Sequence, residues 1–387
     1  MHYLDNAATT QIHPDVADVV QQTLRTHWAN PSALYAPGMA AEAVIEAARG
    51  TLAEALGCQP REVFFTASGT ESNNIALLGA ARARKAWANH LVTTGYEHPS
   101  AQKLLAMLAR HEGFELTEIN PGPDGRVDMQ AMADAVGPKT ALVCAMQVNN
   151  ETGALLDVAA LAEAVKAKNA RCFVHVDGVQ AFGKLPVNLR KTKIDGFAVS
   201  GHKLHAPKGV GALYLRDGIN ILPPFAGGGQ EADSQHRSIR PGTENTAFIA
   251  GFGKAVELAM ARRAGAYTHI AQLREQFLAA FTRLKGTAVH SPADGWPGTV
   301  FISMPAGFKS QVMLEHLYNK FGICVSSGSA CSGGAASHTL TAMGVPAAQI
   351  DAALRISFCA DNTPEDVDIL LRGLRDCLTA LARGCPE

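Results

Sequence analysis

Short apolar runs alternate with stretches of helical spacing between residues 62 and 215. The runs Ala141–Met146 and Cys172–Val176 are almost entirely apolar, which is typical of strands buried on both faces of a sheet. A helix is expected between them, at 158–168. Further strands are expected at 62–66, 90–94, 196–199 and 211–215. This alternation predicts an α/β fold with a mostly parallel sheet and helices on both of its faces.

The pattern outside this region predicts mainly helices before it and a second unit after it. Helices are expected at Pro14–Thr26 and at 38–56, where Gly57 ends the second helix. A long helix is expected from about 246 to 284, with a break near Gly265. The segments that follow are shorter and mixed, and they predict a smaller α+β domain: 299–303, 310–320, 354–358 and 364–382. We place the large domain at 13–256 and the small domain at 1–12 and 257–387.

Composition and charge narrow the class of protein. The chain has 387 residues, of which 47% are hydrophobic and 18% charged, as in an ordinary soluble globular protein. Its formal net charge of -1 leaves no excess of positive charge that would favour binding to nucleic acid or an anionic membrane. The first residues lack the pattern of a signal peptide, and no apolar stretch reaches the ~20 residues of a membrane span. The eight cysteines are dispersed without a CxxC pair, so we expect no metal site, no disulfides and a cytoplasmic location.

Chemically capable side chains follow the expected strands. In parallel sheets, ligands bind at the carboxyl ends of the strands, so side chains placed just after several strands are expected to meet at one edge. The residues in such positions are Thr70, His98, Asn150, Asp177, Ser200 and Lys203. Any one of them alone has an ordinary structural explanation, but their shared position favours a common binding site.

Lys203 and Asp177 carry the most specific chemistry. Lys203 lies in a loop of small and polar residues after a buried strand, where partial burial suits an amine that forms a Schiff base with an aldehyde cofactor. A solvated lysine is the alternative. Asp177 ends another buried strand, where a carboxylate needs a positive partner such as a protonated pyridine nitrogen. Gln180 could then bind the ring hydroxyl; alternatively, Asp177 caps a turn.

A second group of residues has the arrangement of a phosphate site. The expected strand at 62–66 leads through Ser68 and Gly69 into a helix, so free backbone N–H groups and the helix dipole favour an anion there. Ser200 and His202 could hold the same phosphate. The alternative is that the Ser and Thr residues only cap the helix. His98 could stack on a flat cofactor ring and move protons, or could be an ordinary loop histidine.

The segment 325–337 consists almost entirely of small residues and contains Cys331. Such a segment buries little apolar area, so we expect it to be mobile and its thiol to be exposed and reactive. By contrast, Gly227–Glu231 lacks the context of a dinucleotide-binding turn and is expected to be a loop.

Several segments together resemble the cysteine desulfurases of the NifS/IscS-like type, which are pyridoxal-phosphate enzymes of aminotransferase class V. The matching segments span most of the chain, in order: Leu4–Thr10, Ser68–Asn74, Asn149–Gly153, Ser200–Lys203, Arg240–Asn245 and Ser327–Cys331. The resemblance implies the type I fold of pyridoxal-phosphate-dependent transferases. That fold has a large domain with a mostly parallel seven-stranded sheet flanked by helices, and a smaller α+β C-terminal domain.

The resemblance also implies a role for each matching residue. Lys203 would form the Schiff base with pyridoxal 5'-phosphate and later remove the substrate Cα proton. Asp177 would hold the pyridine nitrogen and Gln180 the ring oxygen, while His98 would stack on the ring and act as a catalytic residue in acid–base steps. Gly69, Thr70, Ser200 and His202 would hold the phosphate, joined by Thr243 from the second subunit of a homodimer. Asn150 and Arg355 would bind the carboxylate of L-cysteine.

In the implied reaction, Cys331 attacks the sulfur of the substrate and becomes a persulfide while L-alanine is released. The persulfide would pass to a sulfur-acceptor protein, such as an iron–sulfur cluster scaffold. Two departures from the family's pattern concern this acceptor: residues 232–236 look inserted, and the stretch between Cys331 and Ser337 is shorter. Alternatives are a selenocysteine lyase, a class V aminotransferase, or a non-catalytic scaffold for sulfur assembly.

Overall fold

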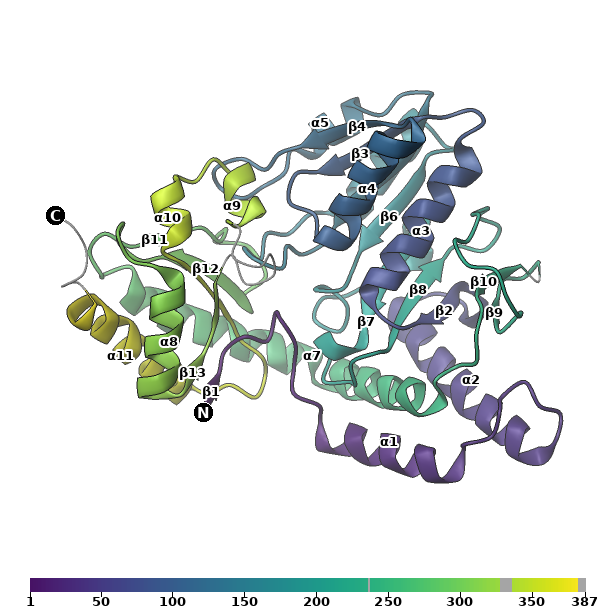
Figure 1. Cartoon of the computed structure of the whole chain (residues 1–387), viewed down its shortest axis with the longest axis horizontal. Helices are drawn as coiled ribbons and strands as arrows, with labels where there is room; N and C mark the ends of the chain where they lie inside the picture. Colours follow the sequence, from purple (N-terminus) through teal and green to yellow (C-terminus); the bar gives the residue numbers. More distant parts are fainter. Residues whose placement is uncertain (236, 328–335, 382–387) are drawn as a thin grey trace.

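The computed structural model describes residues 1–235, 237–327 and 336–381, arranged around two sheets (Figure 1). The larger sheet has seven strands in the order β2-β8-β7-β6-β5-β3-β4. Only β8 runs antiparallel to its neighbours, so the predicted, mostly parallel seven-stranded sheet is confirmed. Its strands are β2 (Val63–Thr66), β3 (His90–Thr94), β4 (Glu115–Ile119), β5 (Thr140–Met146), β6 (Phe173–Asp177), β7 (Gly196–Ser200) and β8 (Gly211–Leu215).

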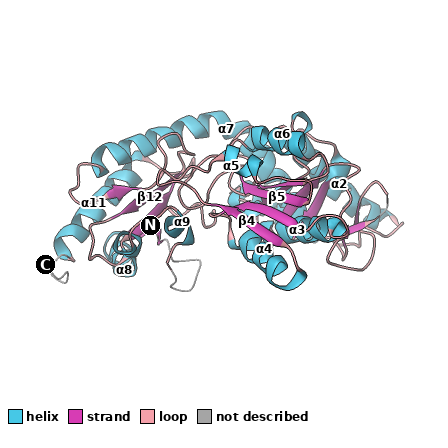
Figure 2. Ribbon diagram, turned by 90° about the horizontal axis from the view of Figure 1, so that it is seen from above, coloured by secondary structure: helices cyan, strands magenta, loops and turns pink. Residues whose placement is uncertain are grey.

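Helices cover both faces of this sheet, which explains the apolar strands (Figure 2). On one face α3 (Gly69–Arg84) and α4 (Pro99–Glu112) pack against residues such as Phe64 and Leu142. On the other face α2 (Ala36–Leu56), α6 (Val158–Lys168) and the long helix α7 (Thr246–Phe281) pack against Val63 and Val143. The remaining helices of this region are α1 (Pro14–Thr26), α5 (Met129–Asp134) and the 3₁₀ turns η1 (Pro60–Glu62), η2 (Leu189–Lys191) and η3 (Gly201–Lys203).

The smaller sheet has four antiparallel strands in the order β11-β12-β15-β14. Beside it, the N-terminal strand β1 (His2–Tyr3) pairs in parallel with β13 (Ile323–Cys324). The other elements here are β11 (Ala288–Val289), β12 (Thr299–Ser303), α8 (Ser310–Phe321), β14 (Ser326–Ser327), α9 (His338–Ala342), α10 (Ala347–Asp351), β15 (Ala353–Ser357) and α11 (Pro364–Ala380). A separate core around Phe277, Ile302 and Leu370 supports the predicted smaller domain. The domain boundary at 256/257 falls inside α7 and stays a prediction.

Helix α7 is continuous over 36 residues, so the expected break near Gly265 is wrong. Its first half belongs to the core of the large sheet through Phe252, and its second half belongs to the core of the small sheet through Phe277. Packing at both ends outweighs the low helix propensity of a single glycine, which costs only about 1 kcal/mol relative to alanine.

We expect Gly265→Ala to raise the free energy of unfolding by about 0.5–1 kcal/mol, measured by urea denaturation. Gly265 is exposed, and an added Cβ would have no neighbour within 4 Å. Gly251 in the same helix is the matched control, because its Cβ would lie 2.5 Å from Val20 Cγ2 and should destabilise the chain. Equal effects of the two substitutions would contradict this reading.

Short strands β9 (Glu231–Ala232) and β10 (Ser238–Arg240) pair beside the edge strand β2. The expectation that Gly227–Glu231 is entirely loop is therefore wrong at Glu231. The buried Glu231 carboxylate accepts bonds of 2.8 and 2.9 Å from the Arg49 guanidinium and one of 2.9 Å from the Phe65 amide. These contacts fix the backbone just before residues 232–236, which the sequence predicts to be an insertion and of which residue 236 lies outside the described residues.

Among the described helices, none combines the length and apolar character needed to cross a membrane.

Candidate functional site

A cavity of about 260 Å³ lies at the carboxyl edge of the large sheet, where β5, β6 and β7 end. Ten of the residues singled out in the sequence line it: Gly69, Thr70, His98, Asn150, Asp177, Gln180, Ser200, His202, Lys203 and Arg355. Thr243 is exposed and does not line this cavity, and Cys331 lies outside the described residues. The structure therefore brings together side chains from segments as distant as α3 and β15.

The N-terminal segment forms one wall of the cavity and holds Lys203. Lys203 ends the 3₁₀ turn η3, directly after β7, and its Nζ donates to the carbonyls of Ala7 (2.5 Å) and Ala8 (2.8 Å). The Gln180 amide also donates to the Ala7 carbonyl, at 2.9 Å. Because that amide nitrogen carries two N–H groups, one of them remains for a ligand.

Asp177 is held by a buried hydrogen-bond chain. Its Oδ2 accepts from Asn73 Nδ2 at 2.8 Å, and its Oδ1 accepts from the Val179 amide at 3.0 Å. Asn73 Oδ1 in turn lies 2.8 Å from Nε2 of His175. Burial lowers the pKa of His175 to about 3. A neutral His175 donates this bond, which fixes the Asn73 amide with its nitrogen toward Asp177.

Sequence reasoning gave no role to Asn73 or Ser100, although both line the cavity. Asn73 Nδ2 also donates to Ser100 Oγ at 2.9 Å, and Ser100 Oγ lies 2.8 Å from His98 Nδ1. Asn73 lies one helical turn after Gly69, on the buried side of α3. A polar residue on the buried side of a helix is the signal that could have identified it.

His98 caps helix α4 and is neutral in this structure. Its Nδ1 accepts from the Ser100 amide at 3.1 Å, so the remaining ring proton is on Nε2. Burial lowers the pKa of His98, and Lys203 and His338 lower it further, while Asp177 raises it. The ring is therefore an uncharged, oriented donor beside Lys203.

The residues predicted to hold a phosphate lie close to Gly69. A Cβ at Gly69 would lie 2.5 Å from Val179 Cγ2, so no larger residue fits without a shift. Ser200 Oγ is buried and has no hydrogen-bond partner among the described residues. The pKa of His202 falls to about 4, mainly through burial, so this ring is also neutral. A buried hydroxyl without a partner beside the N-terminus of α3 could donate to an anionic ligand there.

Arg355 lies on β15, at the side of the cavity that faces the small sheet. Its Nη1 donates to the Asn150 carbonyl at 3.1 Å and its Nη2 to Asp5 Oδ1 at 3.0 Å. Its Nε is buried without a hydrogen-bond partner in the described part of the chain. The guanidinium is thus fixed at one end and keeps a donor for a ligand carboxylate.

Both segments that flank 328–335 are attached near the cavity. On one side, Ser326 pairs with Arg355 in the small sheet. On the other side, Ser337 and Thr339 donate to the Glu151 carboxylate at 2.5 and 3.1 Å. Glu151 belongs to the segment Asn149–Gly153, whose sequence gave this carboxylate no role. The described residues on either side of 328–335 therefore lie close to the site.

Glu97 lies directly under the site and is fully buried. Its Oε1 accepts from Thr94 Oγ1 at 2.5 Å and from the Met146 amide at 2.9 Å. Burial outweighs these bonds and raises the pKa of Glu97 to about 7. The ordinary value is 4.5, so between the two values the folded chain keeps a proton that the unfolded chain loses.

We expect the free energy of unfolding to fall as the pH rises from about 4.5 to about 7, because folding takes up this proton. Glu97→Gln should remove this pH dependence. The size of the effect is about 3 kcal/mol. Urea midpoints of both proteins at pH 5 and pH 8 measure it, with the exposed Glu115→Gln as the control. Parallel pH dependence in the parent and Glu97→Gln would refute the assignment.

Comparison with known proteins identifies the family of the chain. Residues 2–370 match the family model described as aminotransferase class V. Cysteine desulfurases from Nostoc sp. and Gluconacetobacter diazotrophicus are 36% and 38% identical over 98% and 95% of this chain, and over 93% and 91% of their own lengths. The cysteine desulfurase IscS of Methanosarcina thermophila is 34% identical over 99% of this chain and 93% of its own length.

Solved structures give the same result. A NifS-like protein superposes with a TM-score of 0.90 at 34% identity, with 98% of this chain and 99% of that chain covered. SspA in complex with cysteine superposes with a TM-score of 0.81 at 29% identity, over 94% and 100% of the two chains. The matches span almost the whole chain in sequence and in fold, and the predicted type I fold is confirmed. The chain belongs to the class V aminotransferases and, within them, to the cysteine desulfurases.

Proposed function

We propose that the chain binds pyridoxal 5'-phosphate in the 260 Å³ cavity and removes sulfur from L-cysteine, giving L-alanine and a persulfide on Cys331. The observation that carries the proposal is the meeting of Lys203, Asp177 and Arg355 in one cavity that also contains Ser200. An amine, a buried carboxylate and a guanidinium are the groups that an aldehyde, a pyridine nitrogen and a substrate carboxylate require.

The residues present fit the cofactor. Ser200 Oγ is buried without a described partner, and Ser200 Cβ lies 3.5 Å from the position of a Cβ on Gly69, at the N-terminus of α3, where free backbone N–H groups favour a phosphate. We assign the phosphate to Gly69, Thr70, Ser200 and His202, with Thr243 added by a second subunit. Asp177 is assigned to the pyridine nitrogen, Gln180 to the ring oxygen and His98 to the ring face. When bound, pyridoxal phosphate supplies an aldehyde for an amine and a ring that withdraws electrons from the substrate Cα.

The chain's own residues divide the remaining work. Asn150 and Arg355 hold the substrate carboxylate, and the free Nε–H of Arg355 gives one of those bonds. Asp177 keeps a proton on the pyridine nitrogen. Asn73 supports this role because its hydrogen bond fixes the position of the Asp177 carboxylate. Lys203 takes the proton from Cα. The Cys331 thiolate attacks the substrate sulfur, so an S–S bond forms and the C–S bond breaks with its electron pair left on the substrate carbons. A proton added to Cβ and the proton that Lys203 returns to Cα then complete alanine.

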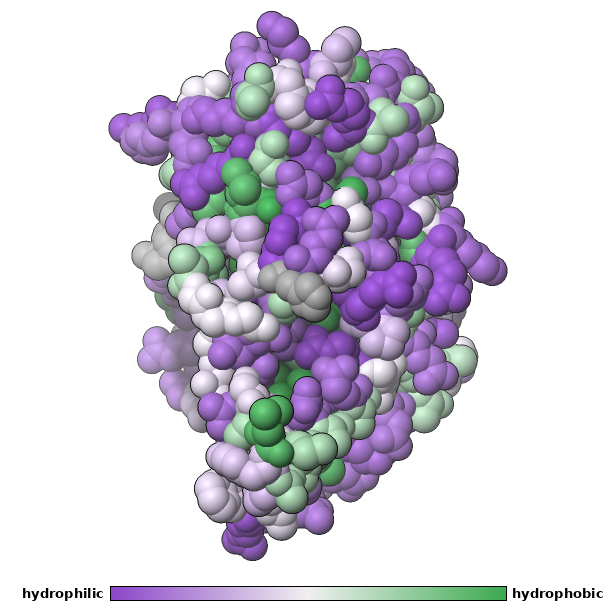
Figure 3. All heavy atoms as spheres, turned by 90° about the vertical axis from the view of Figure 1, so that its right-hand side faces the viewer, coloured by the Kyte–Doolittle hydropathy of each residue, from purple (hydrophilic) through white to green (hydrophobic). Residues whose placement is uncertain are grey.

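The proposal includes a homodimer. Large apolar side chains are exposed near the connection of α1 and α2: Trp28 at 78%, Leu34 at 94% and Met39 at 57%. Figure 3 looks onto the side that carries α2 and the β9–β10 hairpin, and hydrophobic side chains gather on the lower part of that face. Exposed aromatic and apolar groups in one region favour burial against a second copy. We also propose a cytoplasmic location and a sulfur-acceptor protein, such as an iron–sulfur scaffold, as the final partner.

Alanine and sulfide release from L-cysteine with a reductant present tests this function, with the parent chain compared to Cys331→Ala. We expect both products from the parent and neither from the variant. Alanine from both proteins would exclude Cys331 as the attacking thiol. Amino transfer to a keto acid in place of alanine release would show a different class V reaction.

A further inference from the structure

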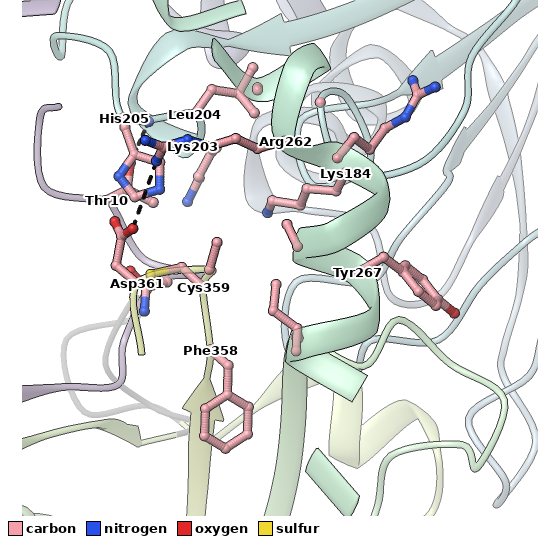
Figure 4. A pocket seen from close by; sticks show the side chains of 18 of the residues that line it. Thr10, Lys184, Lys203, Leu204, His205, Arg262, Tyr267, Phe358, Cys359 and Asp361 are labelled. Atoms are coloured by element: carbon pink, nitrogen blue, oxygen red, sulfur yellow. Dashed lines mark hydrogen bonds and ion pairs between the residues drawn. The ribbon is translucent and has the colours of Figure 1, made fainter. Parts of the chain in front are cut away.

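A second, smaller cavity of about 100 Å³ lies on the other side of Lys203. Figure 4 shows that His205 follows Lys203 on the same loop, and that Cys359 and Asp361 approach it from the small domain. One ligand atom from each of these three side chains lies within 4.8 Å of the other two. His205 lies more than 150 positions before Cys359 and Asp361 in the sequence, so no spacing motif could have revealed the cluster.

His205 is held in an unusual conformation that turns its ring toward the cluster. Its φ of 61° is the single positive value among described non-glycine residues. The ring Nδ1 lies 2.8 Å from the Gln11 carbonyl, which can only accept, so Nδ1 carries the proton and Nε2 keeps its lone pair. A backbone carbonyl that fixes the tautomer of a histidine is the usual outer contact of a metal-binding imidazole.

Cys359 and Asp361 complete the donor set at the turn between β15 and α11. Burial raises the pKa of the Cys359 thiol to about 11, and the backbone N–H groups of Asp361 and Asn362 offset only part of this rise. Asp361 is exposed, and its only described ion pair is a 4.0 Å contact with Arg262, where both side chains are more than half exposed. Such a pair is weak and would be displaced readily.

We propose that His205, Cys359 and Asp361 bind one zinc ion, with the fourth coordination position open to the small cavity. An imidazole nitrogen, a thiolate and a carboxylate form a donor set that suits zinc. Bonds of about 2.0–2.3 Å place tetrahedral ligands roughly 3.3–3.8 Å apart, so the three atoms need to close by less than about 1.5 Å. Binding converts the Cys359 thiol to a thiolate and releases one proton to solvent.

The ion would connect the two domains at the wall of the active site. His205 belongs to the loop that carries Lys203, whereas Cys359 and Asp361 follow β15, which carries Arg355. Zinc binding would thus couple the position of the loop that carries Lys203 to that of the strand that carries Arg355. The inference concerns residues outside the proposed catalytic set, so its failure would leave the proposed desulfurase reaction untouched.

The test is metal titration of the purified holoenzyme that carries Cys331→Ala, so that the loop thiol cannot bind metal. We expect one Zn²⁺ per chain by calorimetry, and visible bands of tetrahedral Co²⁺ when cobalt replaces zinc. Cys359→Ser, His205→Asn and Asp361→Asn should each weaken binding by at least about 100-fold. Asparagine tolerates the left-handed backbone of position 205, and the exposed position 361 makes its variant a safe one for folding.

Cys324→Ser is the matched control, because Cys324 is also a partly buried thiol of the small domain. It should leave zinc affinity unchanged. The proposal is overturned if the Cys331→Ala holoenzyme binds no zinc at micromolar concentration, or if Cys359→Ser and Asp361→Asn bind zinc as tightly as their parent.

Discussion

Lys203→Arg is expected to lower the rate of alanine formation at least about 10³–10⁴-fold while the chain still folds. Arginine keeps the positive charge that meets the carbonyls of Ala7 and Ala8, at 2.5 and 2.8 Å in the parent. A guanidinium cannot lose its proton in a protein, so it can neither bond to an aldehyde nor take a proton from Cα. Steady-state alanine formation and the absorbance of bound cofactor measure the two losses separately.

The control for this substitution is Lys208→Arg, which changes an exposed lysine on the same loop and should leave the rate unchanged. A Lys203→Arg protein that retains more than about a tenth of the parent rate would exclude Lys203 as the group that transfers the Cα proton. Loss of the rate together with the fold, seen as a lowered urea midpoint, would show only a structural role.

Asp177→Asn is expected to lower the rate roughly 10²–10³-fold and to weaken cofactor binding. The amide keeps the size of the carboxylate but carries no charge, so it cannot hold a proton on the pyridine nitrogen. Its oxygen could still accept from the Val179 amide, but its nitrogen would then face Asn73 Nδ2, which donates to Asp177 in the parent. The Asn73 amide would have to turn, and its bond to His175 would break.

Asp195 provides the control for Asp177→Asn. It is another buried carboxylate, at the opposite end of the neighbouring strand β7, so its loss removes a buried charge away from the cofactor site. Asp195 directly precedes β7, is 2% exposed and pairs with Lys166 at 2.6 Å. Asp195→Asn should lower the urea midpoint by breaking this pair but leave cofactor affinity unchanged. Equal losses of cofactor affinity in the two variants would trace the effect of Asp177→Asn to general destabilisation.

The sequence predicts the buried elements of the large domain well, because a strand covered on both faces has only apolar positions. Helices Pro14–Thr26 and 158–168 and strand 90–94 agree with the structure at both ends. Strand β4 was not predicted, since it lies at the sheet edge and most of its side chains are partly exposed. Residues just after strands were expected to meet, and the shared cavity confirms that they do.

The contacts between distant segments could not be predicted from the pattern. Nothing in the sequence indicates that Glu151 receives Ser337 and Thr339, or that Asn73 secures Asp177. These are hydrogen bonds between residues more than 100 positions apart. The pattern of apolar and polar positions reports only on local structure, so it cannot predict them. The break expected at Gly265 was wrong for a related reason, since packing at both ends of α7 decides the outcome.

The N-terminal segment ties completion of the active site to synthesis of the whole chain. The paired residues His2 and Ile323 are 321 positions apart, and Leu4 accepts a bond from the Ser357 amide. At 5–20 residues per second a ribosome needs roughly 16–65 s to make the intervening chain. During that time the segment that contains Ala7 and Ala8, which hold the Lys203 amine, has no β13 or β15 to pair with. A nascent chain that ends before β13 would therefore contain every strand of the large sheet and still lack a finished site for its cofactor.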